Sequence, residues 1–393
     1  MTRTATRIAL ISTAALVLAS CGSGAAGDSA AQAQSTPRPG GTEGAPFAIT
    51  AHGAFNEPWA ADFAPGTSVL FITERPGTMK FVDLPSGRLG TVTGLPKVDY
   101  GGQGGLGDVA FLPTENSATL GTRTIYLSWV EAGQGDTRGA VVGRGKLVCE
   151  EADACRIDGL SVIWRQDPKV SGRGHFSHRI AFAPDGRTMF VSSGERQKFT
   201  PAQDLSVNLG KIVHLNLDGT PAAGNPSFPG VARREIWSLG HRNLLGLQFD
   251  AQGRLWDLEH GPKGGDELNL VKPGQNYGWP VVSNGDNYDG TPIPRHSTRP
   301  EFAPPAVFWN PVIAPGDFAF YSGKLWPEWK GNAVIGGMSP TVLVRVAIDG
   351  ETAREVARYP MEKRIREVVE GPDGALWLLE DGKDGRLLEL RPR

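Results

Sequence analysis

The chain has 393 residues, of which 39% are hydrophobic and 21% charged, so it is long enough to bury a large core. Its formal net charge of −2 argues against a surface for nucleic acid or another polyanionic macromolecule. Glycine (52 residues) and proline (30 residues) are abundant, which favours many short strands joined by turns over long helices.

The first 21 residues have the pattern of an export signal. Arg3 and Arg7 precede an apolar run from Ile8 to Leu18, which is too short to span a bilayer. The ending Leu-Ala-Ser-Cys21 resembles a bacterial lipobox, in which Cys21 would carry lipid; ordinary cleavage beside an incidental cysteine is the alternative. Residues 22–46 have the composition of a disordered tether, so the folded domain is expected over 47–393.

A short unit recurs along the rest of the chain: an apolar strand, a turn rich in Pro, Asp or Gly, and a second strand. Copies lie at 59–73, 109–129, 180–192, 247–258 and 368–379, and the gaps leave room for one more at 317–346. This repetition predicts an all-β fold of the β-propeller type, because the chain is too long for one sandwich. Loops of all blades converge on a propeller's channel, so residues distant in sequence can share one pocket.

Two cysteines remain after Cys21, namely Cys149 and Cys155. Export makes a disulfide between them the expected state, closing a small loop at a hairpin tip. Two free thiols are the alternative.

Two segments in the first half of the chain carry polar side chains of interest. Gln103 is the single polar side chain of the glycine-rich stretch 101–107, which is either a turn between blades or a loop that leaves Gln103 free to face a ligand. If the segment 174–179 is extended, His175, Ser177 and Arg179 share one face. His175 is then a candidate general base, with a structural hydrogen-bonding role as the alternative.

The segment from Glu259 to Pro280 places Asp266 and Glu267 between glycine-rich turns. Glycine lets the backbone turn its carbonyls toward one point, and carboxylates with carbonyls are the ligands that calcium prefers. A turn with solvated acids is the alternative. The histidines and cysteines have no zinc spacing, and no Gly-x-Ser-x-Gly elbow of a serine hydrolase is present.

Arginines form the third group of candidates. Strand alternation would send the side chains of Arg364 and Arg366 one way and Ile365 the other. Together with Arg242 they could grip a ligand that carries several carboxylates. Surface arginines paired with Glu362 and Glu367 are the alternative.

Taken together, these segments resemble the soluble pyrroloquinoline-quinone (PQQ) dependent sugar dehydrogenases, the glucose/sorbosone and aldose dehydrogenase family. The resemblance extends from Pro58 to the C-terminus. The motifs that carry it are Thr73-Glu-Arg-Pro-Gly77, Gly102-Gln-Gly-Gly-Leu106, His175-Phe176 with Arg179, Gly240-His-Arg-Asn243, Glu259-His-Gly-Pro262 with Gly265-Asp-Glu267, Asn276-Tyr-Gly-Trp-Pro280, and Arg364-Ile-Arg366 with Gly371-Pro-Asp-Gly374.

The resemblance implies a six-bladed β-propeller with PQQ across the mouth of its channel. It also implies oxidation of an aldose sugar at C1 to the lactone, with hydride transfer to PQQ and His175 as general base. The other residues to which it gives a role near the cofactor are Gln103, Arg242, Asn243, Arg364 and Arg366.

The same resemblance implies calcium. The backbone carbonyls of Gly261 and Pro262 correspond to ligands of a calcium that also holds PQQ. Glu267 and the backbone of Tyr277 correspond to ligands of a second calcium, with Asp266 close by.

The chain departs from the family pattern at several positions. Ser339 stands where a lysine contacts PQQ, and losing that cation should weaken binding by about 1.5–3 kcal/mol unless another, such as Arg345, compensates. Leu244 and Leu245 replace a proline and a glutamine, and Ser177-His178 replaces Gly-Gly.

Two alternatives therefore stay open: a calcium-dependent propeller lactonase or hydrolase, and a non-catalytic ligand-binding propeller of the envelope. The expected location is the bacterial cell envelope, facing the periplasm and touching the membrane only through the lipid at Cys21. The expected partners are a sugar and an unidentified electron acceptor.

Overall fold

The structure is a computed structural model that describes residues 44–230 and 232–393. The described residues form 24 β-strands and three short 3₁₀ helices, η1 (Thr200–Gln203), η2 (His296–Thr298) and η3 (Pro327–Trp329). None of these helices has the length and apolarity needed to cross a bilayer. The expected export signal and nearly all of the expected tether lie outside the described residues.

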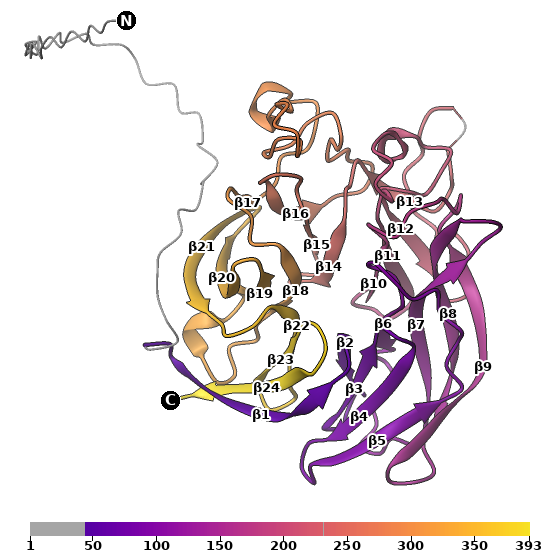
Figure 1. Cartoon of the computed structure of the whole chain (residues 1–393), viewed down its shortest axis with the longest axis vertical. Coiled ribbons are helices and arrows are strands. Elements are labelled where there is room, and N and C mark those ends of the chain that lie inside the picture. Colours follow the sequence, from indigo (N-terminus) through magenta and orange to yellow (C-terminus); the bar gives the residue numbers. More distant parts are fainter. Residues whose placement is uncertain (1–43, 231) are drawn as a thin grey trace, which may run out of the picture. The chain divides into compact units, whose positions relative to one another are not determined.

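The strands form six antiparallel blades of four strands each (Figure 1). In chain order, the first three blades are β2 (Pro58–Phe63), β3 (Val69–Glu74), β4 (Thr78–Asp83) and β5 (Arg88–Thr93); β6 (Leu106–Phe111), β7 (Thr122–Ala132), β8 (Arg138–Val148) and β9 (Ala154–Arg165); and β10 (Ser177–Phe182), β11 (Thr188–Ser193), β12 (Lys211–Asn216) and β13 (Ile236–Leu239). The other three are β14 (Leu244–Phe249), β15 (Leu255–Glu259), β16 (Asp266–Val271) and β17 (Val307–Trp309); β18 (Pro315–Phe320), β19 (Ala333–Met338), β20 (Thr341–Asp349) and β21 (Thr352–Pro360); and β22 (Ile365–Glu370), β23 (Leu376–Glu380), β24 (Gly385–Pro392) and β1 (Phe47–Phe55).

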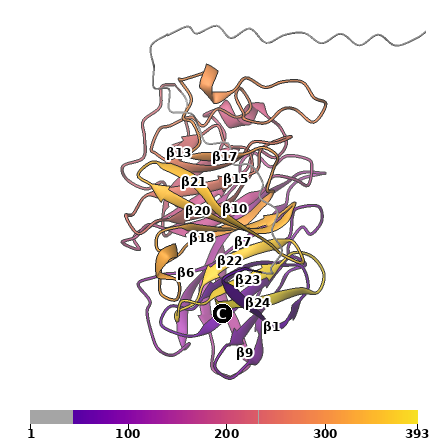
Figure 2. The same cartoon turned by 90° about the vertical axis from the view of Figure 1, so that its left-hand side faces the viewer.

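The innermost strands contact one another in a closed ring, β2, β6, β10, β14, β18, β22 and back to β2. The last blade joins both ends of the described chain, because β1 pairs antiparallel with β24, with Phe47 opposite Pro392 (Figure 1). Seen from the side, the sheets of the last two blades lie one above the other (Figure 2). The expected six-bladed β-propeller is confirmed.

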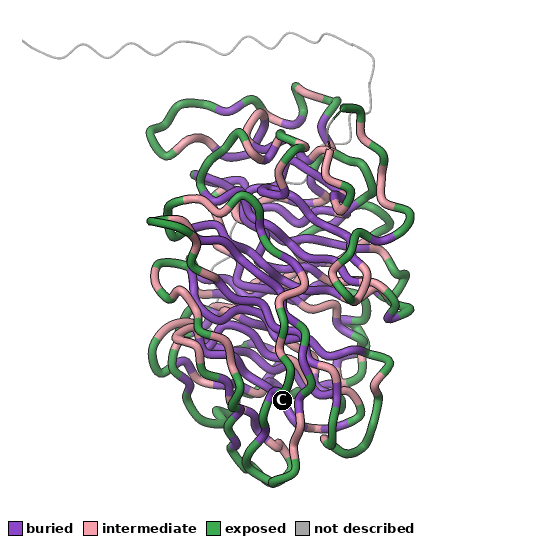
Figure 3. Tube along the Cα trace, turned by 90° about the vertical axis from the view of Figure 1, so that its right-hand side faces the viewer, coloured by how far each residue is buried: buried purple, intermediate pink, exposed green. Residues whose placement is uncertain are grey.

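Apolar side chains fill the space between neighbouring blades, and burial is concentrated in the middle of the sheets rather than at their turns (Figure 3). Between the first two blades, Phe71 packs against Phe81 and Phe111 with ring centroids 5.2 and 5.1 Å apart. The inner strands are buried on both faces; all six residues of β3 and of β6 are buried. This explains why those strands lack the alternation of polar and apolar residues seen on half-buried sheets.

Each recurring unit in the sequence corresponds to the first strands of one blade. The unit expected at 317–346 is the fifth blade, in which β18, β19 and β20 span that range. One pairing was not expected: the outer strands β5 and β9 run parallel, with Val92 opposite Cys155, and so join the first two blades into one sheet.

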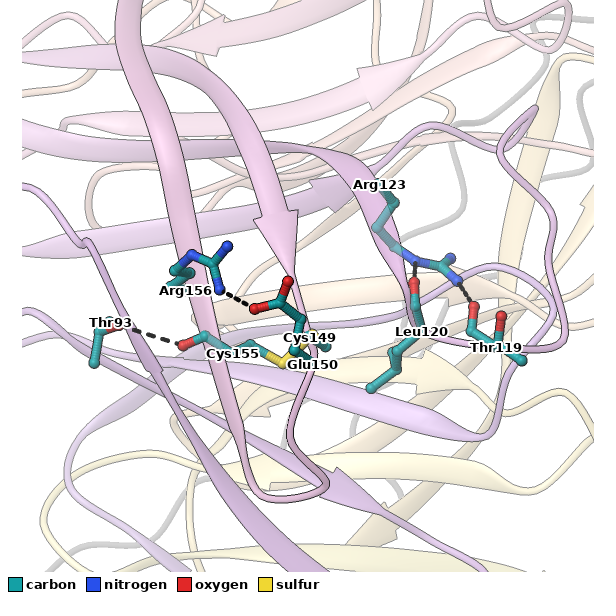
Figure 4. Close-up of a disulfide and its surroundings, with 8 residues drawn as sticks. All are labelled: Thr93, Thr119, Leu120, Arg123, Cys149, Glu150, Cys155 and Arg156. Carbon is teal, nitrogen blue, oxygen red and sulfur yellow. Dashed lines mark hydrogen bonds and ion pairs between the residues drawn. A yellow bond between two sulfur atoms is a disulfide. The ribbon is translucent and has the colours of Figure 1, made fainter.

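Cys149 and Cys155 form the expected disulfide at the tip of the β8–β9 hairpin (Figure 4). Beside it, Arg156 forms an ion pair with Glu150, and Thr93 of β5 donates a hydrogen bond to the carbonyl of Cys155 (Figure 4). The disulfide therefore closes the hairpin that carries the link between the first two blades.

Inner-strand carboxylates connect one blade to the next. Asp62 accepts a hydrogen bond from the backbone N–H of Phe111 (3.0 Å), and Asp108 accepts one from that of Ile180 (2.7 Å). Glu367 accepts one from the N–H of Ala61 (3.3 Å) and so links the last blade to the first. Because β2, β6 and β10 are the edge strands of their sheets, the N–H groups on their open side have no strand partner, and side-chain oxygens accept their hydrogen bonds instead.

Arg179 occupies the centre of the ring. Its guanidinium donates to Glu367 (2.6 Å) and to the carbonyl of Leu245 (2.7 Å), contacts Asp108 at 3.3 Å, and lies 4.2 Å from the centroid of the Trp59 ring. Burial opposes the charge, but Asp317, Glu367 and Asp108 outweigh it and raise the pKa of Arg179. The channel is therefore filled at its centre by an ion network.

Candidate functional site

A cavity of about 240 Å³ lies where the inner strands begin. Its lining comes from strands of all six blades or from loops beside them. The lining residues are Trp59, Arg75, Gly102, Gln103, Phe176, Ser177, His178, Asn243, Leu245, His260, Met338, Arg364, Arg366 and Asp381. The cavity thus brings together Gln103, Asn243, Arg364 and Arg366, four of the residues expected from the sequence to bind a cofactor.

His175 lies beside this cavity on the turn that enters β10. The turn is not extended as expected, because His175, Ser177 and His178 have φ values of 50°, 60° and 67°. Ser177 and His178 therefore adopt the left-handed conformation that glycine tolerates best, which fits the Gly-Gly of the family pattern. Arg179 consequently points into the centre of the ring instead of sharing a face with His175.

Two contacts orient His175, which is 7% exposed. Its backbone N–H donates to Oε1 of Gln103 (2.6 Å), and its Nδ1 lies 2.5 Å from Oε1 of the buried Glu195. Burial lowers the pKa of His175, against the opposing hydrogen bond from Glu195. Burial raises the pKa of Glu195, but the hydrogen bonds to His175 and to the N–H of Phe199, together with the nearby positive charge of Arg242, outweigh burial, so the net shift is downward. This combination describes a neutral imidazole that donates Nδ1–H to a carboxylate and keeps the lone pair of Nε2 available.

Glu195 is a site residue that the sequence analysis missed. Its second oxygen, Oε2, accepts hydrogen bonds from the N–H groups of Lys198 (2.5 Å) and Phe199 (2.6 Å). No motif marks this position, and a single acid after a strand has no pattern of its own. Only the pairing of β10 with β11 brings it to His175.

Arg364, just before β22, and Arg366, within it, behave as the alternation predicts. Arg364 and Arg366 both reach Asp381 at the cavity wall, at 2.8 and 2.7 Å, while Ile365 is fully buried in the core. The alternative partners proposed from the sequence are wrong, since Glu362 pairs with Arg386 and Glu367 with Arg179.

A further cation lines the cavity where the sequence analysis expected none. Arg75 hydrogen-bonds to the carbonyls of Gly102 and Gly104 and pairs with Glu57 at 3.2 Å, while its buried Nε has no partner. Arg345, the residue expected to compensate for Ser339, lies instead against the Trp329 ring and Asn332, outside the cavity.

With Arg75, Arg364 and Arg366 against one carboxylate, Asp381, the cavity lining is cationic. Its two histidines add no charge, because burial lowers the pKa of both His178 and His260 to about 3. A cavity with this donor set fits a ligand that carries several carboxylates.

Arg242 borders a second, much smaller cavity of about 10 Å³, enough for one water-sized particle. His260 lines both cavities, so the two are neighbours. NH1 of Arg242 donates to the carbonyls of His260 (3.1 Å) and Gly261 (2.7 Å), and its buried Nε has no partner. The residues lining this small cavity include Gly261, Glu259, Glu267, Tyr277 and Ser283.

The expected calcium ligands gather around this small cavity. Glu267 is buried, and burial together with the nearby charge of Glu259 raises its pKa well above the usual value, as happens when carboxylates share a site without a cation. The carbonyl of Tyr277 accepts a hydrogen bond from Nε2 of His296 (3.1 Å). Pro262 is buried and follows Gly261 in the loop.

The hydrogen bonds of the Asp266 carboxylate give this residue a structural role. Its Oδ1 accepts from the N–H of Gly261 (2.9 Å), and its Oδ2 accepts from the N–H groups of Ile313 (2.8 Å) and Ala314 (2.7 Å). Asp266 therefore fixes the Gly261 loop against the chain that enters the fifth blade.

Comparison with known proteins agrees with this geometry. A model of the family described as Glucose / Sorbosone dehydrogenase matches residues 55–389. Aldose sugar dehydrogenase YliI of Escherichia coli (strain K12) is 35% identical over 346 residues, which cover 86% of this chain and 91% of that protein.

Solved structures agree as well. The apo-form of the soluble aldose sugar dehydrogenase from Escherichia coli superposes with a TM-score of 0.79 at 33% identity, covering 88% of this chain and 100% of the other. The PQQ-bound form of an aldose sugar dehydrogenase from Streptomyces coelicolor gives 0.70 at 27% identity, covering 88% and 98%. The chain is therefore an oxidoreductase that belongs to the glucose/sorbosone dehydrogenase family.

Proposed function

We propose that this protein oxidises an aldose sugar at C1 to the lactone, using PQQ and calcium, with His175 as the general base. The observation that carries the proposal is the neutral, carboxylate-oriented imidazole of His175 next to a cationic cavity at the channel mouth. PQQ, when bound, supplies the electron chemistry by accepting the hydride that leaves C1.

The chain's own residues handle the proton. Because Nδ1 of His175 is engaged by Glu195, Nε2 is the nitrogen that takes the proton of the C1 hydroxyl as the lactone carbonyl forms. The ionised Glu195 stabilises the imidazolium that results. Gln103 holds the backbone of His175, so both contacts reduce the freedom of the base before substrate binds.

The residues present fit PQQ. Its three carboxylates match the arginines of the larger cavity, Arg364 and Arg366 together with Arg75. Asn243 and Gln103 add uncharged hydrogen-bonding groups to the same lining. Arg75 supplies the positive charge that Ser339 lacks, so the missing lysine does not argue against cofactor binding.

The residues around the smaller cavity fit calcium. Glu267 would provide a buried carboxylate and Tyr277 a backbone carbonyl for one calcium, and the backbone carbonyls of Gly261 and of Pro262, next in the chain, would serve the calcium that also holds PQQ. These are the hard oxygen donors that calcium takes. The carbonyl of Gly261 now accepts from Arg242, so this oxygen would be shared or released when the ion binds. A cation here would polarise a neighbouring quinone oxygen as a Lewis acid.

The test is a dye-reduction assay. Purified protein with PQQ and calcium is expected to reduce a redox dye with at least one of a panel of aldoses, and PQQ is expected to raise its melting temperature. His175→Ala should lose turnover and keep the PQQ-dependent thermal shift.

The outcomes separate the alternatives. Hydrolysis of lactones with calcium alone, without a redox dye, would instead identify the protein as a lactonase. No turnover with any sugar and no thermal shift with PQQ would reject the dehydrogenase and leave the non-catalytic binding propeller.

The proposed location is the bacterial envelope, with the propeller held outside the membrane by lipid on Cys21. Cys21→Ser should release the protein from the membrane fraction, and metabolic labelling with a fatty acid should disappear. Retention of the label would contradict lipidation at this residue.

A further inference from the structure

Behind the smaller cavity, three ionisable side chains meet in the core of the fourth blade. They are His241, Asp257 and Glu259, exposed by 0%, 0% and 4%. The ring of Tyr277 covers His241, with centroids 4.7 Å apart. Among the described residues, no lysine or arginine side chain forms an ion pair with Asp257 or Glu259, and the basic side chain that contacts both acids is the imidazole of His241.

The single hydrogen on Nδ1 of His241 cannot form a full hydrogen bond to both carboxylates at once. Nδ1 of His241 lies 3.2 Å from Oε1 of Glu259 and 3.4 Å from Oδ2 of Asp257. Oδ2 of Asp257 is buried and has no hydrogen-bond partner. Leaving such an oxygen unpaired in the core is costly, so this atom points to a group that the side chains themselves do not supply.

The spacing of the three atoms is that of a metal site. Zinc binds nitrogen and oxygen ligands at about 2.0–2.1 Å in a tetrahedron, which places its ligand atoms about 3.3 Å from one another. The two measured separations from Nδ1, 3.2 and 3.4 Å, match that edge length. We propose that His241, Asp257 and Glu259 bind a divalent transition metal of the zinc class, at a site separate from calcium.

The outer contacts of these residues are those that metal ligands have. The other ring nitrogen of His241, Nε2, lies 2.9 Å from Oγ of Ser238 and can donate to it, which leaves Nδ1 free for the metal. Oε2 of Glu259 accepts from the backbone N–H of Arg242 (2.6 Å). Hydrogen bonds of this kind orient ligands and fix the imidazole tautomer.

Asn269 offers a fourth ligand. Its Nδ2 lies 3.1 Å from Asp257 Oδ1 and 3.2 Å from Glu259 Oε1, while its buried Oδ1 has no partner. Rotating the Asn269 amide by 180° would exchange Nδ2 and Oδ1 and direct Oδ1 toward the proposed metal position. The site would then have one nitrogen and three oxygen donors. The imidazole favours a transition metal over calcium, which prefers oxygen ligands alone.

The experiment measures metal content. The protein is stripped with a chelator, incubated separately with Zn²⁺, Co²⁺ or Ca²⁺, freed of unbound ion and analysed by elemental mass spectrometry. We expect about one Zn²⁺ or Co²⁺ per chain in the presence of saturating Ca²⁺, a higher melting temperature, and a visible Co²⁺ spectrum of low coordination number.

Two variants and two matched controls assign the ion to these side chains. His241→Gln and Asp257→Asn should lose the bound zinc and its thermal shift. His214→Gln and Asp250→Asn should keep both, since His214 is also stacked and hydrogen-bonded and Asp250 is also a buried acid of the fourth blade. Zinc retained in both test variants would overturn the proposal.

A measurement on the unsubstituted protein covers the case in which the variants do not fold. Anomalous diffraction at the zinc edge should give a peak between His241, Asp257 and Glu259. A zinc-loaded crystal with no peak there would overturn the proposal and leave the imidazole hydrogen-bonded between two acids. Neither outcome depends on PQQ or on sugar oxidation, so the proposed function can fail while this site stands, or the reverse.

Discussion

At the scale of single residues, the site depends on how two side chains hold His175. Glu195 fixes Nδ1 and Gln103 fixes the backbone N–H, so the ring has one nitrogen left for chemistry. The same burial that positions the ring also disfavours its charged form. Orientation and basicity at neutral pH therefore come from one local environment.

The first prediction concerns pH. Because burial lowers the pKa of His175 below its usual 6.5, the neutral base persists when the pH falls to that value. We therefore expect the acidic limb of the kcat/KM profile to be centred below pH 6.5. The measurement is kcat/KM against pH over the range in which the protein stays folded, and an acidic limb centred at or above 6.5 would contradict it.

The second prediction separates Glu195 from a purely structural residue. Glu195→Gln keeps the shape but removes the charge that stabilises the imidazolium, so kcat should fall by about 10²-fold, the lower end of what general-base catalysis contributes. KM and the PQQ-dependent thermal shift should change little. A fall in kcat that is accompanied by a clearly lower melting temperature would instead indicate a folding defect.

The third prediction concerns the cation that replaces the family lysine. Arg75→Gln should weaken PQQ binding about tenfold to hundredfold, as expected for one charged hydrogen bond of about 1.5–3 kcal/mol. Calorimetric titration of the calcium-loaded protein gives the dissociation constant. Arg345→Gln is the control, and a larger effect there than at position 75 would refute our assignment.

At the scale of elements, the sequence predicts some strands much better than others. The inner hairpins of five blades follow from apolar runs that flank turns rich in Pro, Asp and Gly, and that of the fifth blade was inferred only from the gap in the repetition. The parallel pairing of β5 with β9 could not be foreseen, because it depends on how two blades meet and not on either strand's pattern.

The turn before β10 was predicted wrongly for a related reason. Nothing in Ser177 or His178 signals a left-handed backbone, which is imposed by packing: His178 stacks on Trp59 and hydrogen-bonds to Ser128. The arginines of β22 were placed correctly, since strand alternation alone decides which way they point. Glu195 and Arg75 were missed as site residues because their roles arise only when separate loops converge.

The fourth prediction concerns the β8–β9 hairpin. Replacing both Cys149 and Cys155 by serine removes a short covalent loop, which should lower the free energy of unfolding by about 2 kcal/mol. Equilibrium denaturation in urea measures the change. Turnover should stay at the unsubstituted level, because neither cysteine lines the cavity; loss of turnover in folded protein would contradict this.

At the scale of the whole propeller, one buried cation, the guanidinium of Arg179, links several blades to one another. Arg179 of the third blade contacts acids of the second, fifth and sixth blades. Apolar packing between neighbouring blades supplies most of the burial, and the Arg179 network adds contacts across the channel. Removing the Arg179 side chain should therefore lower the stability of the whole propeller.

The fifth prediction tests that role. Arg179→Met leaves buried carboxylates without their counter-charge, and breaking a buried ion pair in this way costs about 3–5 kcal/mol. Equilibrium unfolding should show a loss of this size, with Arg187→Met, on the exposed β10–β11 turn, as a nearly neutral control. A loss below about 1 kcal/mol would mean that the network contributes little net stability.

The pairing of β1 with β24 has a consequence for how the molecule is made. A ribosome releases Phe47 long before Pro392, yet these residues are opposite each other in one blade. The first five blades can assemble while synthesis continues, but the sixth lacks its outer strand's partner until the final residues emerge. The last blade is thus completed only after β24 has been synthesised, and a nascent chain that stops before β24 would leave β1 and β23 of that blade with open edges.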